Sequence, residues 1–90
     1  MVPIERVQTG VRIERRLLKV LKALAEHRDM SLGDLIEGIV LHAFEGKTAF
    51  SRDSLAQINR LRLVYGLDLT SKDAHGLVDR TAEPKRRARR

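Results

Sequence analysis

The feature that most constrains this chain is an alternating stretch between residues 6 and 13. One parity holds Val7, Thr9, Val11 and Ile13, and the other holds Arg6, Gln8, Gly10 and Arg12. A two-residue period of this length is typical of a β-strand with one buried and one polar face. No second stretch of this kind follows in the 90 residues. Because a lone strand leaves its backbone N–H and C=O groups unpaired, we expect it to pair antiparallel with the same strand of a second chain.

Positive charge is concentrated at the two ends of the sequence. The net charge is +6, of which residues 1–22 carry +4, residues 23–84 carry −3 and residues 85–90 carry +5. This distribution of positive charge, doubled in a dimer, suits binding to nucleic acid or to an anionic membrane surface better than binding to a small-molecule substrate. The basic residues of the tail are Lys85, Arg86, Arg87, Arg89 and Arg90. We expect this tail to be disordered in the free protein and to touch DNA without sequence preference.

After the strand, the hydrophobic period changes to that of a helix. Apolar residues at helical spacing predict a first helix from about Arg15 to His27, and Asp29 can take the left-handed conformation that ends helices. Ser31 is the expected N-cap of a second helix, which Gly46 ends. The apolar face of that second helix is wider than one neighbouring helix requires. Gly38, in its middle, would let another backbone come close.

Further capping signals divide the rest of the chain. Ser51 or Asp53 would cap a third helix that ends at Gly66. Thr70 and Asp73 predict a cap that opens a short fourth helix through Ala74, Leu77 and Val78. We therefore expect a mostly helical chain with three parts: residues 1–46 for dimerisation and DNA binding, residues 47–83 as a helical extension with one or two helices, and residues 84–90 as the basic tail.

The order of strand, helix, short turn and capped helix in residues 6–46 resembles the Arc/MetJ-like ribbon-helix-helix superfamily. In that family two strands pair across a dimer axis and enter the major groove of DNA as a ribbon. The resemblance implies that the base-reading residues are Gln8, Gly10 and Arg12. It implies a backbone phosphate at the amides of Ser31 and Leu32. The expected dimer core consists of Val7, Thr9, Val11, Ile13, Leu35, Gly38 and Ile39.

The chemistry of the polar face agrees with reading bases. Arginine fits guanine O6 and N7, and glutamine fits adenine N6 and N7. Arg6 is a further candidate phosphate contact, whereas Arg15 and Arg16 suit phosphate contacts and an ordinary exposed helix face equally well. We therefore predict a homodimeric, sequence-specific DNA-binding regulator of transcription, most simply a repressor, located in the cytoplasm on the nucleoid. Two alternatives are an antitoxin, whose residues 47–83 would bind a toxin or another protein, and an oligomerisation module that does not bind DNA.

Other classes of function find little support. The absence of cysteine excludes disulfides and thiolate chemistry, and no run of 18 apolar residues is present to suggest a membrane partner. The three histidines, His27, His42 and His75, are scattered and have no neighbouring ligands, so we expect no metal site. Without a glycine-rich phosphate loop or an activated nucleophile, we expect no enzymatic activity and no cofactor.

Overall fold

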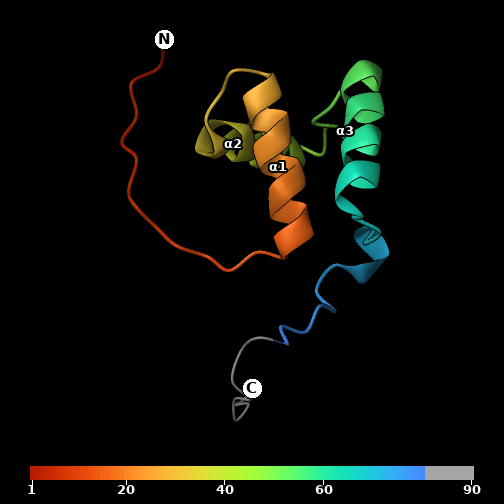
Figure 1. Cartoon of the computed structure of the whole chain (residues 1–90). Helices are drawn as coiled ribbons and strands as arrows, with labels where there is room; N and C mark the ends of the chain where they lie inside the picture. Colours follow the sequence, from red (N-terminus) through yellow and green to blue (C-terminus); the bar gives the residue numbers. More distant parts are fainter. Residues whose placement is uncertain (81–90) are drawn as a thin grey trace.

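The chain consists of three α-helices and one helical turn in a computed structural model that describes residues 1–80 (Figure 1). The helices are α1 (Arg15–His27), α2 (Leu32–Phe44) and α3 (Arg52–Tyr65), and the turn is the 3₁₀ element η1 (Ser71–Asp73). The predicted mostly helical character is confirmed. Residues 1–80 contain no β-strand, so the strand predicted for residues 6–13 is not formed within one chain.

α1 has the predicted bounds, and its first turn is held by a residue that the sequence did not suggest as a cap. The Glu14 carboxylate accepts a hydrogen bond from the backbone N–H of Leu17 at 2.8 Å. This bond is the main reason that the pKa of Glu14 is lowered, and the nearby Arg16 guanidinium adds to the effect. At the other end, Asp29 takes the predicted left-handed conformation, with φ 55°.

Because Glu14 supplies this bond, Glu14→Ala should lower the free energy of unfolding by about 1 kcal/mol, as for removal of other N-caps. The lowered pKa means that the stabilisation is present above the ordinary glutamate pKa and disappears as pH falls through the folded-state value. The difference between wild type and Glu14→Ala should therefore shrink below about pH 4. Urea denaturation at pH 7 and pH 3 measures it. Glu5→Ala, which removes the same charge outside any helix, is the control, and an equal loss in both variants would contradict the capping role.

The other two helices begin and end where their capping residues predict. Ser31 Oγ accepts a hydrogen bond from the backbone N–H of Asp34 at 3.1 Å, and Gly46 follows the end of α2 with φ 70°. Of the two predicted caps for α3, Ser51 is the one used, since its Oγ accepts the backbone N–H of Ser54 at 3.2 Å. Gly66 ends α3 with φ 66°.

The predicted fourth helix is wrong in length. Thr70 and Asp73 do form the predicted reciprocal capping box, but it opens only the single 3₁₀ turn η1. The chain then leaves helical geometry at His75, whose φ is 69°, and residues 76–79 have no regular structure. The C-terminal extension therefore has one full helix, α3, within the described residues.

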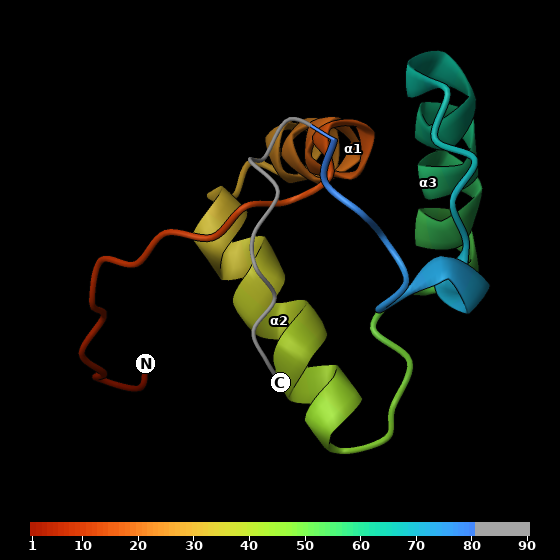
Figure 2. The same ribbon diagram turned by 90° about the horizontal axis from the view of Figure 1, so that it is seen from below.

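α1 lies between the other two helices and carries the centre of the core (Figures 1 and 2). Leu24 is 1% exposed and packs with Ala25 and with Leu35 of α2. The partly buried residues around this cluster are Leu21, Met30, Ile39, Phe50, Ile58 and Leu61. Leu35 and Ile39, which were expected in a dimer core, thus contribute to the core of the single chain. No close backbone contact joins α2 to α3, both of which are fully described.

Candidate nucleic-acid interface

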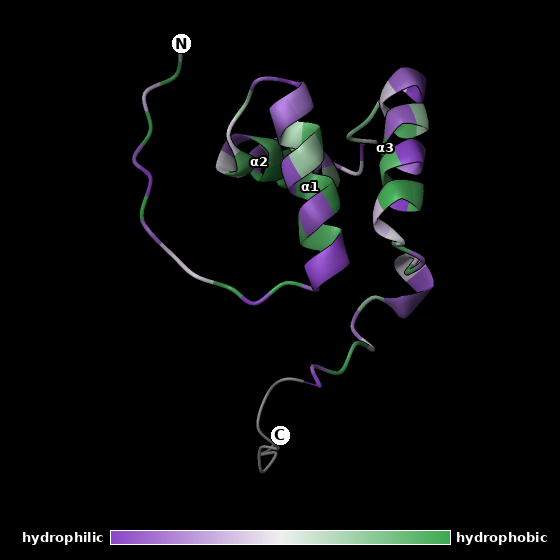
Figure 3. Cartoon of the chain, viewed as in Figure 1, coloured by the Kyte–Doolittle hydropathy of each residue, from purple (hydrophilic) through white to green (hydrophobic). Residues whose placement is uncertain are grey.

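The N-terminal segment, residues 1–14, runs along the outside of the molecule before α1 begins (Figure 1). Hydrophilic and hydrophobic residues alternate along it (Figure 3). Val7 and Val11, expected to face inward, are 78% and 75% exposed, Thr9 is also exposed, and Ile13 is half-buried. These side chains are exposed because the described part of the chain has no other strand that could cover the segment or pair with its backbone. The same lack of a partner strand is the reason to predict a dimer.

The second half of α2 is also uncovered. Leu41 is 63% exposed and Phe44 is 81% exposed, although both are large apolar side chains. A Cβ built on Gly38 would meet nothing within 4 Å, so no segment within residues 1–80 makes the close approach expected there. An apolar helix with a bare second half is typical of an element that packs against a partner.

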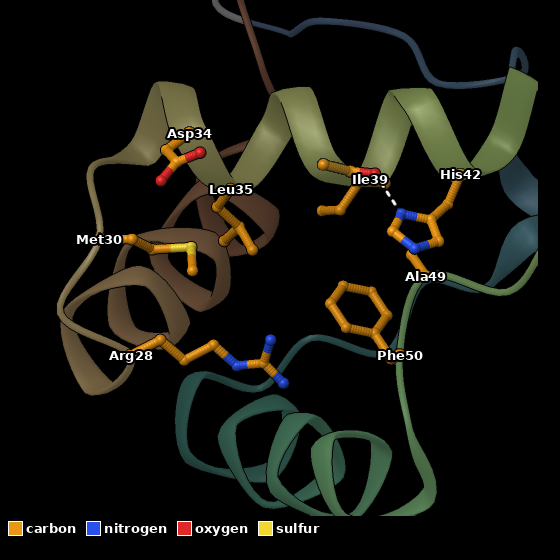
Figure 4. Close-up of a pocket in the computed structure, with 9 residues that line it drawn as sticks. Arg28, Met30, Asp34, Leu35, Ile39, His42, Ala49 and Phe50 are labelled. Atoms are coloured by element: carbon orange, nitrogen blue, oxygen red, sulfur yellow. Dashed lines mark hydrogen bonds between the residues drawn. The ribbon is translucent and has the colours of Figure 1, made fainter. Parts of the chain in front are cut away.

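A cavity of about 180 Å³ lies against α2 and is lined by α2, by the turn before it and by the linker that follows it. Figure 4 shows the Phe50 ring and Ile39 facing this space, with the Arg28 side chain extending along its floor. Arg28 donates a hydrogen bond to Ser54 Oγ, and His42 Nδ1 lies 2.7 Å from the Gly38 carbonyl oxygen. The remaining lining residues are Met30, Asp34, Leu35, Gly38 and Ala49. Arg28 and His42 thus have partners inside the chain.

The three residues of the predicted base-reading set, Gln8, Gly10 and Arg12, are all exposed. Arg12 binds a carboxylate of the C-terminal segment: its Nε and Nη2 lie 2.9 Å and 2.6 Å from Asp79 Oδ2. The predicted phosphate contact Arg6 is bound in a similar way, since its Nε and Nη2 donate to the two carboxylate oxygens of Glu37 at 2.8 Å each. These hydrogen bonds raise the pKa of Arg6 and lower the pKa of Glu37.

The other predicted phosphate contacts fall into two groups. Arg15 and Ser31 are exposed and Leu32 is half-buried, so the first turn of α2 is open to solvent at its cap. Arg16 instead donates to the Gly66 carbonyl oxygen at 2.9 Å and to Asp68 at 3.0 Å, and it also binds Glu14 at 3.0 Å. Arg16 therefore joins the start of α1 to the end of α3. The predicted tail contacts, Lys85, Arg86, Arg87, Arg89 and Arg90, lie outside the described residues.

The sequence predictions missed the two carboxylates that hold these arginines. Glu37 lies 31 residues after Arg6, and Asp79 lies 67 residues after Arg12. No local pattern connects residues at such separations. The only signal was the excess of acidic residues in residues 23–84, which opposes the basic N-terminal region without naming a pair.

The chain matches no known family model, no curated protein and no solved structure. Among residues 1–80, no three histidine or acidic side chains come together in a group that could hold a metal ion. In the same part of the chain, no helix is both long enough and apolar enough to cross a membrane.

Proposed function

We propose that two copies of this chain form a dimer that binds double-stranded DNA sequence-specifically and regulates transcription as a ribbon-helix-helix repressor. The observation that carries the proposal is the exposed alternating segment, residues 6–13, placed directly before two capped helices. The segment leaves valine side chains and a row of backbone groups without a partner strand among the described residues. Pairing with its copy would satisfy the backbone groups and bury one side-chain parity.

The opposite parity supplies the chemistry for DNA. Gln8 and Arg12 would face the groove on both strands of the ribbon, where amide and guanidinium groups can each make bidentate contacts to purines. The exposed first turn of α2 offers backbone N–H groups and the positive end of a helix to a phosphate. In this arrangement the basic tail would add affinity that falls with salt and does not depend on sequence.

α3 favours a second candidate function that involves a protein partner. The exposed apolar residues of α3 are Leu55, Leu63 and Val64, and no element of the described chain covers them. Exposed apolar side chains on the extension are what an antitoxin would need in order to bind a toxin, or another regulator to bind its partner. This candidate is compatible with DNA binding through residues 6–13, because α3 and that segment are different surfaces.

Assembly and DNA binding are tested together with the full chain. We expect a dimeric mass in sedimentation equilibrium, an unfolding midpoint that rises with protein concentration, and binding to a labelled random duplex at low salt. Selection from a pool of randomised duplexes should enrich a palindromic sequence, because a two-fold dimer reads two equivalent half-sites.

Two valine variants provide the matched control for this test. Val11→Asp should abolish the dimer, because it places a charge on the parity that the ribbon buries, whereas Val2→Asp, outside the alternating segment, should leave it intact. A monomeric mass with a concentration-independent midpoint would contradict the dimer. A dimer that binds no duplex would leave only the oligomerisation module.

A further inference from the structure

Two arginines of the proposed DNA-binding segment are held by carboxylates of the same chain. Glu37 of α2 accepts two parallel hydrogen bonds from Arg6, and Asp79 accepts two from Arg12. Both ion pairs are exposed, with N–O distances of 2.8 Å and 2.6 Å. Arg6 is a proposed phosphate contact and Arg12 a proposed base contact, so the carboxylates occupy the donors that DNA would use.

The donor geometry makes the two partners mutually exclusive. A guanidinium presents its N–H groups as a planar fork, and the Nε and Nη2 groups that bind a carboxylate side-on also match a phosphate or the O6/N7 edge of guanine. We propose that Glu37 and Asp79 compete with DNA for Arg6 and Arg12, so that DNA binding has to exchange two intrachain ion pairs in each subunit. This inference rests on the proposed function, because it concerns the regulation of the same site.

The path of the chain brings Asp79 to this position. After η1, residues 74–80 run back from the end of α3 toward the start of α1, where the N-terminal segment joins the helices (Figures 1 and 2). The C-terminal segment thereby places a negative charge on the base-reading parity. Glu37, in the first half of α2, places a second negative charge beside Arg6. Two carboxylates of residues 23–84, Glu37 and Asp79, thus oppose the positive charge of the N-terminal region in the free protein.

The size of the effect follows from the exposure of the pairs. Exposed ion pairs contribute little free energy, so removing one carboxylate should raise DNA affinity by about two- to fivefold per chain. Removing any negative charge also favours DNA binding in general, so the comparison requires a variant with the same charge change elsewhere. Glu45 provides it, because it is exposed and pairs with Lys47 at 3.2 Å, outside the proposed interface.

The experiment measures the affinity of Asp79→Asn, Glu37→Gln and Glu45→Gln for the duplex selected as the operator, at one salt concentration and by fluorescence anisotropy. The first two should bind about 4- to 25-fold more tightly than Glu45→Gln, because each dimer carries two copies of the substitution. In an Arg12→Ala background, Asp79→Asn should have no more effect than Glu45→Gln, because the arginine it releases is absent. Equal affinities of all three single variants would overturn the competition.

A measurement without DNA separates this inference from the proposed function. The pKa of Glu37, followed by NMR titration, should be depressed in the wild type and should rise in Arg6→Ala, because Arg6 supplies the hydrogen bonds to its carboxylate. An unchanged pKa would overturn the Arg6–Glu37 competition even if DNA binds. If the pKa rises as expected but the wild type binds no duplex, the ion pair is real, while the proposed function fails and the competition fails with it.

Discussion

Leu24→Ala should lower the free energy of unfolding by about 2–5 kcal/mol, the range for truncating a fully buried leucine. Leu24 is the most deeply buried side chain of the core at 1% exposure, and it packs with Ala25 and Leu35. Alanine would leave a cavity between α1 and α2, and the small core offers few side chains that could move to fill it. Urea denaturation at fixed protein concentration measures the loss.

Leu63→Ala is the matched control, since it makes the same truncation on α3 at a position that is 83% exposed. It should change the free energy of unfolding by less than about 0.5 kcal/mol. Similar losses in the two variants would mean that Leu63 is buried in the assembled protein. In that case the exposed apolar side chains of α3, rather than residues 6–13 alone, would belong to the subunit interface.

Arg12→Ala should weaken operator binding by about 1–3 kcal/mol for each bidentate hydrogen-bond pair to a base that the substitution removes, and a dimer has two copies of Arg12. Its affinity for random duplex should change little, because hydrogen bonds to bases contribute mainly to discrimination. The measurement titrates wild type and variant with the selected operator and with random DNA at one salt concentration.

Arg15→Ala is the comparison for this prediction. Arg15 is exposed at the start of α1 and is a candidate phosphate contact, so its removal should weaken binding to both duplexes alike. Equal effects of Arg12→Ala on operator and random DNA would make Arg12 a phosphate contact. Dissociation of the dimer in Arg12→Ala would mean that the two faces of the strand have been assigned the wrong way round.

The helix ends were predictable because capping is a local interaction. Each capping residue acts within one turn of its own position. The hydroxyl groups of Ser31 and Ser51 cap the starts of α2 and α3, and Gly66, which has no side chain, ends α3 in the left-handed conformation. Glu14 was missed because glutamate is not among the preferred N-cap residues. The fourth helix was predicted from a real capping box, but Gly76 and the positive φ of His75 follow within one turn, and so short a helix does not repay the cost of nucleation.

The candidate site was predictable only in part, for a different reason. The alternation in residues 6–13 identifies two faces, but which face becomes buried depends on a second backbone, and one chain does not supply it. The partners of Arg6 and Arg12 depend on how α2 and the C-terminal segment return to the N-terminal segment. That is a property of the tertiary fold, so these carboxylates could be found only from the structure.

The central position of α1 has a consequence for how the protein folds. α1 contacts its sequence neighbour α2 and also α3, whereas no close backbone contact joins α2 to α3. α1 and α2 can therefore pack as a hairpin as soon as both have been synthesised, and α3 then adds Ile58 and Leu61 to the core that they form. Contacts that are this local favour fast folding within a chain. In the proposed dimer the slow step is then the encounter of two chains, and active protein accumulates faster than in proportion to the number of copies made.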